Sequence, residues 1–424
     1  YVFSLFILLS AVIGSKAQQL TNRGVNLEPI IPFTEINFST LPDNWLFTIE
    51  FQTNKAFPEP KGYSKELKSS IDKQRMLHLM NQAKNKTNNT NTVTAPSIDR
   101  VFTGNGSNGT PNDNSVAISN GGKIVSVVNT NVRMYDETGT SINPYKSLSA
   151  ITTNQLGALN RTYDPRIIYD PLADRFIMVF LQGDSSNDSR IVIGFSQSND
   201  PTLSWKFYSL AGNRWGNGTW FDYPIVCISK KDLFVTGNLL QDGKSWREGF
   251  KQSIIWQVKK QDGFDGLPLS SKYYDSITYN GRPIWSICAV QGGSQPWGPE
   301  TYFISLRPGD ASNDTVFLHT VSNTLESGTA TLGTRILKSN KPYGLPPSAI
   351  QPSGQYLQTN DARALSSIIE GGIIYFVGNT IEPVNFSPSV YLGKITGLYA
   401  SPQVTAQYIS YDTLDIGYPS LAYI

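Results

Sequence analysis

The sequence predicts an all-β protein, a β-propeller built from four-stranded antiparallel blades. Short apolar strands separated by tight polar turns recur from about residue 97 onward, and no helical pattern alternates with them. A polar or charged residue stands before the first strand of each repeat, about every 50 to 60 residues with one longer gap, which suits a four-stranded sheet with its loops. The composition, with 35 Gly, 25 Pro and 21 Tyr, also favours many strands and turns.

Five repeats and the start of a sixth can be followed along the chain. Their first strands lie in SVAIS, IIY, IVCIS, GRPIWSICAV and ALSSIIE, and SLAYI opens the sixth. We expect six or seven blades in the intact protein, with the last blade truncated in this chain. A tandem of two β-sandwiches is the alternative for the same strand pattern.

The sequence pattern of residues 1–17 predicts a cleaved export signal. An apolar run of thirteen residues, Val2 to Gly14, is followed by Ser15-Lys16-Ala17, and such a run is too short to span a membrane. Because the chain opens on Tyr1 rather than Met, we expect the basic start of the signal to be missing. The sequence has no later stretch as long as a transmembrane helix, so we expect a secreted or outer cell-surface protein without a membrane anchor of this kind.

We expect residues 18–94 to form an N-terminal extension that precedes the propeller. It contains one strand in WLFTIEFQT, a helix over residues 64–84 with Leu67, Ile71 and Leu77 on one side, and a polar linker in NKTNNTNTVTAPS. We place the boundary near Thr94, so that the propeller domain covers residues 95–424 and is incomplete at its C-terminus.

Composition excludes several functions. The formal net charge of +2 gives no broad basic surface, so a nucleic-acid partner is not expected. The two histidines are not in an HExxH or nucleophile-elbow pattern, and two cysteines cannot form a multi-Cys zinc site. We expect Cys227 and Cys288 to be small buried side chains, with a single bridge between neighbouring strands as the alternative. No cofactor is expected, although the turn at residues 170–174 has two acids that could hold structural calcium or only shape the turn.

The polar residues at the strand starts are the first candidate site. In a propeller, each innermost strand begins near the central axis, so charged residues there face water and one another instead of a strand interior. Paired carboxylates at this position could act as acid and base on a glycosidic bond, while arginines hold an acidic sugar. The alternative is that Asp–Arg pairs neutralise one another and fix the strand starts. These residues are Asp113, Asp164, Arg166, Asp222, Tyr223, Arg282, Asp361, Arg363, Asp415 and Tyr418.

Aromatic residues in glycine-rich loops are the second candidate site. NRWGNGTWFDY contains Trp215 and Trp220, and GGSQPWGPETY contains Trp297. Aromatic rings on loops stack on sugar rings, whereas the alternative is that they pack between blades. From both candidates we predict ten ligand-binding residues: Asp164, Arg166, Trp215, Trp220, Asp222, Tyr223, Arg282, Trp297, Asp361 and Arg363.

Two resemblances support the predicted fold. SNDPTLSW is similar to the Asp-box of sialidase-like propellers, because Ser198, Asp200 and Trp205 match in register, whereas Thr202 stands in place of the usual glycine. The stretches GTPNDNSVAISNGGKIVSVVNTNVRMYD, YDPRIIYDPLADRFIMVFL and WFDYPIVCISKKDLFVTGN resemble a family of secreted, propeller-like proteins of Bacteroidota. That resemblance covers about residues 97–424 and implies export through the type IX route, but no established activity.

The main functional prediction is a secreted or cell-surface, non-catalytic propeller, a monomer that binds a glycan or a cell-surface protein. The alternative is an extracellular glycoside-cleaving enzyme, sialidase-like or lyase-type, that uses the central Asp and Arg residues. A sialidase-like site would also need a glutamate beside a tyrosine, and the sequence places none convincingly beside Tyr223 or Tyr418. A purely structural surface protein is the third interpretation.

Overall fold

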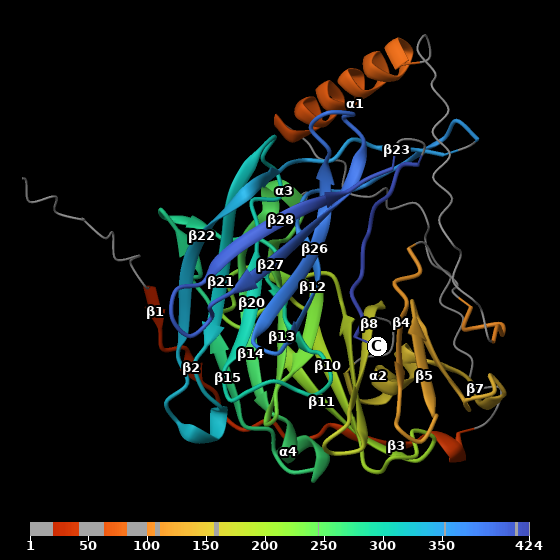
Figure 1. Cartoon of the computed structure of the whole chain (residues 1–424). Helices are drawn as coiled ribbons and strands as arrows, with labels where there is room; N and C mark the ends of the chain where they lie inside the picture. Colours follow the sequence, from red (N-terminus) through yellow and green to blue (C-terminus); the bar gives the residue numbers. More distant parts are fainter. Residues whose placement is uncertain are drawn as a thin grey trace, which may run out of the picture.

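A computed structural model describes residues 20–41, 63–82, 100–106, 111–156, 161–244, 246–351, 353–411 and 414–423. It is an all-β structure with successive four-stranded antiparallel sheets (Figure 1). The first sheet contains β4 (Ser115–Ile118), β5 (Ile124–Val128), β6 (Asn131–Tyr135) and β7 (Ser141–Ser147). The second contains β8 (Thr162–Asp170), β9 (Arg175–Gln182), β10 (Arg190–Ser196) and β11 (Ser204–Ala211).

The later repeats form three more four-stranded antiparallel units, and the fourth and fifth units are joined by a parallel bridge between their last strands, Ser339 with Val404. The third contains β12 (Thr219–Ile228), β13 (Asp232–Gln241), β14 (Phe250–Lys259) and β15 (Ser271–Tyr274). The fourth contains β18 (Cys288–Ala289), β20 (Thr301–Ser305), β21 (Asn313–Val321) and β22 (Leu332–Tyr343). The fifth contains β25 (Ala364–Glu370), β26 (Ile373–Ile381), β27 (Pro388–Thr396) and β28 (Gln403–Ile409).

Short elements connect these sheets. The helices are α2 (Leu148–Leu156), α3 (Trp246–Gly249), α4 (Lys260–Phe264) and the 3-10 turn η2 (Leu325–Ser327). The short strands are β16 (Thr278–Tyr279), β17 (Arg282–Pro283), β19 (Gln291–Gly292), β23 (Ala349–Ile350) and β24 (Tyr356–Leu357). In Figure 1, α3 lies toward one end of the strands and α4 lies at the other end.

The strands follow chain order within each sheet, and the first strands of successive sheets lie side by side. β4 contacts β8, β8 contacts β12, β12 contacts β18, and β18 contacts β25. The five first strands therefore form an inner wall, which is consistent with the predicted propeller. The fourth strands β7, β15, β22 and β28 were not assigned from the sequence, because polar residues interrupt their apolar pattern.

The hydrophobic core lies between successive sheets. One cluster joins the second and third sheets through Phe195 and Trp256, and another joins the fourth and fifth through Ile304 and Phe376. Two further clusters join the first to the second sheet and the third to the fourth. Because both faces of the middle strands β9, β10 and β13 are buried, these strands are nearly continuous apolar runs rather than alternating ones.

The N-terminal segment adds an outer strand to three of the sheets. β1 (Leu20–Asn22) pairs with β22, β2 (Val25–Asn26) pairs with β15, and β3 (Thr34–Asn37) pairs with β11. The 3-10 turn η1 (Phe38–Thr40) follows, and Phe38 is buried against Trp205 at 6.1 Å in an edge-to-face contact. Residues 20–41 therefore cover edges that would otherwise be open to pairing with another chain.

Helix α1 (Tyr63–Gln82) packs on the last part of the chain. Ile71 is buried as predicted, but Leu77 is 62% exposed, so the predicted apolar side is only partly covered. Polar contacts hold the helix: Asp72 accepts the backbone N–H of Ser348, and Arg75 forms a buried ion pair with Asp415 at 2.8 Å. Asp415, one of the predicted strand-start residues, thus anchors a helix.

Several predictions fall outside the described residues: the export signal at 1–17, the strand in WLFTIEFQT, and the linker with its boundary near Thr94. Within the described ranges, no helix combines the length and the apolar composition that crossing a membrane requires. Cys227 and Cys288 are both buried and are not joined by a disulfide.

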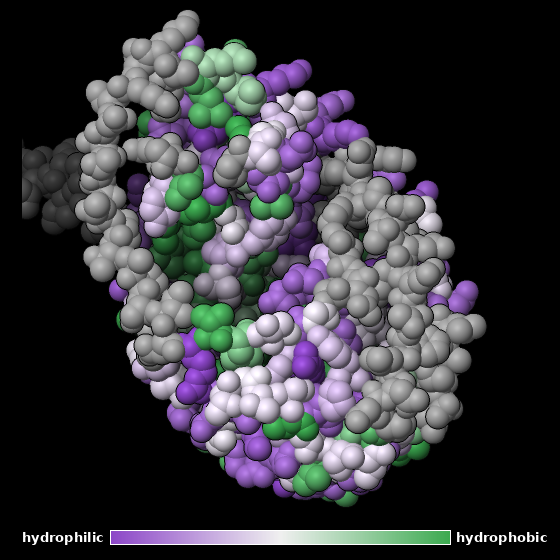
Figure 2. Space-filling model, turned by 90° about the vertical axis from the view of Figure 1, so that its right-hand side faces the viewer, coloured by the Kyte–Doolittle hydropathy of each residue, from purple (hydrophilic) through white to green (hydrophobic). Residues whose placement is uncertain are grey.

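The side of the molecule seen in Figure 2 is hollowed, and apolar residues line part of the hollow. Val116 and Ile118 on the inner strand β4 are 58% and 59% exposed. Within the part of the chain that the structure describes, no neighbouring sheet covers these two side chains.

Candidate functional site

Six residues with left-handed backbone lie within or close before the first strands of successive repeats, or at the equivalent position in the last stretch of the chain. They are Asp113, Asp164, Tyr223, Ser286, Asn360 and Tyr418, with φ values from 41° to 60°. In β8 and β12 the pairing register shifts at this point, which makes a β-bulge inside the strand. Non-glycine residues seldom adopt positive φ, and such strain concentrates at functional sites. The sequence placed Asp164 and Asp222 before their strands, and this was wrong, because both strands begin earlier.

Buried asparagines hold three of these strained residues. In each case the asparagine comes from the second strand of one sheet or directly follows it, and its Oδ1 accepts the backbone N–H of the residue in the next repeat. The pairs are Asn129 with Asp164, Asn238 with Ser286 and Asn379 with Tyr418, at 2.9, 3.2 and 2.7 Å. Each asparagine therefore links one repeat to the start of the next.

A central cavity of ≈ 200 Å³ is lined by residues of four first strands, β4, β8, β12 and β25, and of the short strand β19. Its polar lining includes Arg166 of β8, Tyr223 of β12 and Gln291 of β19. The Arg166 Nε donates to the backbone oxygen of Pro224 at 3.1 Å, which fixes the arginine across the gap between two sheets. The apolar part of the lining comes from the first strands themselves, through Ile167, Ile168, Ile225, Val226 and Leu365.

Two aspartates near this cavity have carboxyl groups that resist ionisation. Burial, followed by the nearby charges of Asp222 and Asp113, raises the pKa of Asp164 well above its usual value, although Arg166 and Arg161 oppose the shift. Burial raises the pKa of Asp222 to about 6, against the opposing effects of the Tyr223 backbone N–H and of Arg363. Such pairs of carboxyl groups with shifted pKa values are typical of acid and base residues.

Asp113 completes this acidic group. Its Oδ2 accepts a hydrogen bond from the Asn129 Nδ2 at 2.5 Å, while the same asparagine holds the backbone of Asp164 through its Oδ1. One side chain therefore positions two of the three aspartates. We call Asp113, Asp164 and Asp222 the central aspartates.

A buried ion pair borders the same region. The Arg363 Nε and Nη2 each donate to Asp361 at 2.8 Å, and both side chains are almost fully buried. The Arg363 guanidinium also lies over the Tyr223 ring, 4.5 Å from its centroid. Arg363 is thus rigid, and its charge lowers the pKa of Asp222 relative to what burial alone would give.

The structure brings six of the ten predicted ligand-binding residues into one central group, in which Arg166 and Tyr223 line the cavity and the charges of the others act on this group. They are Asp164, Arg166, Asp222, Tyr223, Asp361 and Arg363. The repeat pattern predicted this grouping because each of them stands at the same position in its repeat. Asn129 and Arg161 were missed, although an asparagine at the end of an apolar second strand recurs as VVN, VTGN and FVGN.

The other four predicted residues lie elsewhere. Arg282 is exposed on the β16–β17 hairpin, and Ser286 takes the strained position in the fourth repeat. The Trp215 Nε1 donates to Asp275 at 2.8 Å, and its ring packs on Tyr273 of the outer strand β15.

Trp220 and Trp297 are both partly covered. Trp220 packs against the core between the second and third sheets. The Trp297 backbone oxygen accepts the N–H of Lys230, which follows β12, so Trp297 lies beyond the end of this strand, whereas Tyr223 lies in its middle.

The Asp-box-like turn forms in the predicted place, between β10 and β11. The Asp200 Oδ1 accepts the backbone N–H of Thr202 at 2.9 Å, and the buried Trp205 donates through Nε1 to Pro201. These contacts shape the hairpin.

The turn at residues 170–174 uses its acids within the fold. Asp170 pairs with Lys260 at 2.6 Å, and Asp174 accepts a hydrogen bond from the Tyr169 hydroxyl at 2.5 Å. Among the described residues, no group of three or more His, Cys, Asp or Glu side chains is arranged to hold a metal ion.

No protein-family model and no curated protein matches the chain. Among solved structures it is similar to a putative exo-β-1,3-galactanase from Bifidobacterium bifidum, with 11% identity, 72% of this chain and 93% of the other covered, and a TM-score of 0.35. A GH43 β-1,3-galactosidase gives 12% identity, 72% and 95% coverage, and a TM-score of 0.35. A subtype N11 neuraminidase-like protein from a flat-faced bat virus gives 10% identity, 72% and 90% coverage, and a TM-score of 0.30.

These comparisons correct the main functional prediction. The similar structures include glycosidases, so the prediction of a non-catalytic binding propeller is wrong on this comparison, and the alternative, a glycoside-cleaving enzyme, is the better match. All three TM-scores are below 0.5, so the likeness assigns no chemistry to individual residues, and any chemistry of this chain depends on the geometry of its central aspartates.

Proposed function

We propose that this protein is a glycoside hydrolase and that Asp164 and Asp222 are its acid and base. The observation that carries the proposal is the pair itself: two aspartates that directly precede or lie within two residues of the cavity-lining Arg166 and Tyr223, with both pKa values raised and the Asp222 charge acting on Asp164. Cleavage of a glycosidic bond needs one carboxylic acid to protonate the leaving oxygen and one carboxylate on the other side of the sugar.

The environments of the two residues assign their roles. Burial and two neighbouring aspartates raise the pKa of Asp164 well above its usual value, which favours the protonated form, so we assign Asp164 as the general acid. Asp222, with a pKa of about 6, is mostly ionised at neutral pH and acts as the base or nucleophile. Asp113 supplies negative charge that raises both pKa values.

The surrounding cations support this arrangement without neutralising it. Arg363 is fully engaged by Asp361, and Arg166 is held by the backbone of Pro224. Both arginines can therefore stabilise charge that develops on the sugar or the carboxylates without moving. The Tyr223 side chain also lines the cavity, and its ring is already covered on one side by Arg363.

The test is a release assay for reducing sugar on a panel of polysaccharides and aryl glycosides, including β-1,3-galactan and sialosides. The proposal expects turnover of at least one substrate, reduced by a factor of about 100 or more in Asp222→Asn and in Asp164→Asn. Asp265→Asn, which removes an exposed carboxylate near α4, is the matched control and should keep full activity. Unchanged rates in both central variants would refute the assignment.

We further propose that the protein is exported and acts outside the cell. The support is the sequence pattern of residues 1–17 and the resemblance to secreted Bacteroidota proteins, which implies the type IX route. N-terminal sequencing of the protein from culture medium tests the first point: a start at or near Gln18 is expected, and retention in the cell with an intact N-terminus would contradict it.

A further inference from the structure

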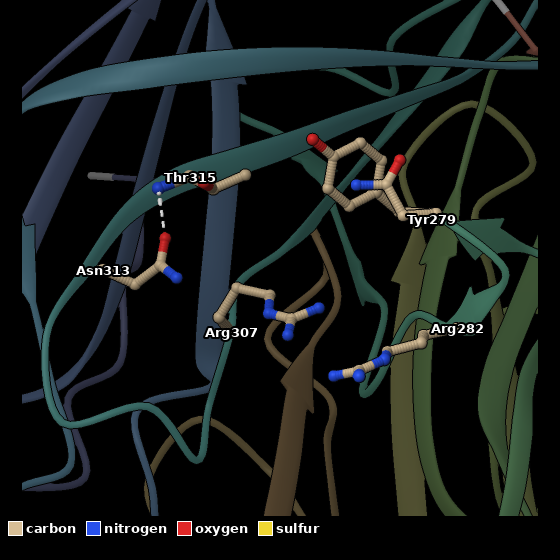
Figure 3. Close-up of a pocket in the computed structure, with 6 residues that line it drawn as sticks. Tyr279, Arg282, Arg307, Asn313 and Thr315 are labelled. Carbon is tan, nitrogen blue, oxygen red and sulfur yellow. Dashed lines mark hydrogen bonds between the residues drawn. The ribbon is translucent and has the colours of Figure 1, made fainter.

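A second cavity, of ≈ 410 Å³, lies in the fourth repeat and shares no lining residue with the central cavity. Figure 3 shows the residues around it, and two of them are arginines. The lining consists of Tyr279, Asn280, Arg282, Arg307, Asn313 and Thr315. We call this the arginine cavity.

A rigid hairpin forms one wall of the arginine cavity. Asn280 and Gly281 have φ values of 50° and 71°, as in a type I′ turn, and this turn places Tyr279 directly opposite Arg282. The Tyr279 ring packs on Phe317 at 5.3 Å. The backbone of Arg282 is therefore placed at the cavity by a short turn of defined geometry.

The loop between β20 and β21 forms the opposite wall. The Arg307 Nε lies 3.5 Å from an oxygen of Asp310, and the same oxygen accepts a hydrogen bond from the Asn313 Nδ2 at 2.6 Å. Asn313 in turn accepts the backbone N–H of Thr315 at 2.8 Å. Asp310 thus holds one edge of Arg307, and in Figure 3 the terminal nitrogens of Arg307 extend into the cavity.

The two guanidinium groups point toward one another across this space (Figure 3). Within the described ranges, no carboxylate lies at ion-pair distance from Arg282. Two cations that converge in this way repel each other until an anion lies between them, and guanidinium groups bind carboxylate and sulfate oxygens in pairs.

We propose that the arginine cavity binds the oxyanion of an acidic glycan, a carboxylate or a sulfate, between Arg282 and Arg307. The Tyr279 ring provides an apolar face for the sugar that carries this group, and Asn280 and Asn313 provide amides for its hydroxyls. That the ligand is a glycan rests on the proposed function, whereas binding of the oxyanion does not. The substrates of the proposed hydrolase would then be glycans that carry carboxylate or sulfate groups.

The test is saturation-transfer NMR with three monosaccharides: galacturonic acid, galactose 6-sulfate and neutral galactose. The proposal expects transfer to at least one acidic sugar, much weaker transfer to galactose, and a loss of signal at high salt. Arg282→Ala and Arg307→Ala should each weaken binding about tenfold. The two acidic sugars distinguish a carboxylate site from a sulfate site.

Two control variants distinguish a failure of this binding proposal from a failure of the proposed hydrolase activity. Arg214→Ala removes an exposed arginine that lies over Trp215, outside the cavity, and should leave binding unchanged. Asp222→Asn should abolish cleavage but keep the signal of the acidic sugar. Three results would overturn the proposal. The wild-type protein gives no transfer signal to either acidic sugar, it gives an equal signal to galactose, or Arg282→Ala binds the acidic sugar as well as the wild-type protein does.

Discussion

Asp222 has opposite effects on stability and on the proposed chemistry. Its pKa is raised from 3.8 to about 6 on folding, so the folded state holds the proton more tightly than the unfolded state. Its contribution to stability is therefore greatest below pH 3.8 and falls as the pH rises through 6, by on the order of 3 kcal/mol. Catalytic groups often impose such a cost on the fold.

We predict that Asp222→Asn is more stable than the wild-type protein at pH 8 but not at pH 4. The neutral amide avoids the buried negative charge, so the gain should approach the same few kcal/mol above pH 6. Urea unfolding at both pH values measures it, with Asp265→Asn as the control that should show no such gain. A loss of stability at pH 8 would mean that the arginines stabilise the Asp222 charge more than burial destabilises it.

His319 should produce the opposite pH dependence. Burial lowers its pKa to about 3, and its ring nitrogens hydrogen-bond to Thr334 and Ser305. A histidine with a lowered pKa contributes stability that is present above pH 6.5 and is lost as the pH falls toward 3, by on the order of 5 kcal/mol. We predict that His319→Gln flattens the acid side of a plot of Tm against pH. An unchanged slope between about pH 6.5 and 4 would contradict this.

The sequence predicted the central grouping of residues but not its details. Equivalent positions in a repeat meet at the axis, so Asp164, Asp222 and Arg363 could be grouped from their spacing alone. Arg282 was grouped with them because it is charged, whereas the strained backbone position belongs to Ser286. The charge of a residue does not show whether that residue occupies a β-bulge. The positive φ at a bulge depends on how the strand pairs with its neighbour.

At the scale of the element, the asparagines after or within the second strands act as links between repeats. Asn129 and Asn379 are both buried and both accept a backbone N–H from the next repeat, but only Asn129 contacts a central aspartate. The two residues therefore form a matched pair for separating a structural role from a positioning role. Loss of either acceptor leaves a buried N–H without this partner, which costs about 1 to 3 kcal/mol.

We predict that Asn129→Ala and Asn379→Ala lower the free energy of unfolding by similar amounts, but that only Asn129→Ala changes the chemistry. Without Asn129, Asp113 and the backbone of Asp164 are released, so kcat should fall and the pH profile of kcat should shift, while KM changes little. Steady-state kinetics across pH and urea unfolding on both variants provide the measurement. Equal kinetic effects in both variants would assign Asn129 a structural role only.

Two other groups of strands were harder to predict from the sequence. β7, β15 and β28 are the fourth strands of their repeats and contain polar residues, so their apolar signal is weak. β1, β2 and β3 are two to four residues long and pair with strands more than 160 positions away, so no local pattern could assign them.

At the scale of the whole molecule, residues 20–41 connect three sheets that the chain otherwise builds separately. β1, β2 and β3 cover the outer edges of the fourth, third and second sheets. Next to β3, the side chain of Phe38 is buried against the second sheet. Each edge strand that is left uncovered is a template for pairing with another molecule. The segment should therefore affect both stability and solubility.

We predict that a variant lacking residues 1–41 has a lower Tm and aggregates with increasing concentration, while a variant lacking residues 1–19 keeps the three outer strands and does neither. Phe38→Ala in the longer protein tests the packing separately and should cost about 3 to 5 kcal/mol, because it leaves a cavity beside Trp205. Calorimetry and light scattering over a range of concentrations measure both effects. If the two truncated variants behave alike, the sheets hold together through their shared core clusters alone, and the outer strands contribute only to coverage of the surface.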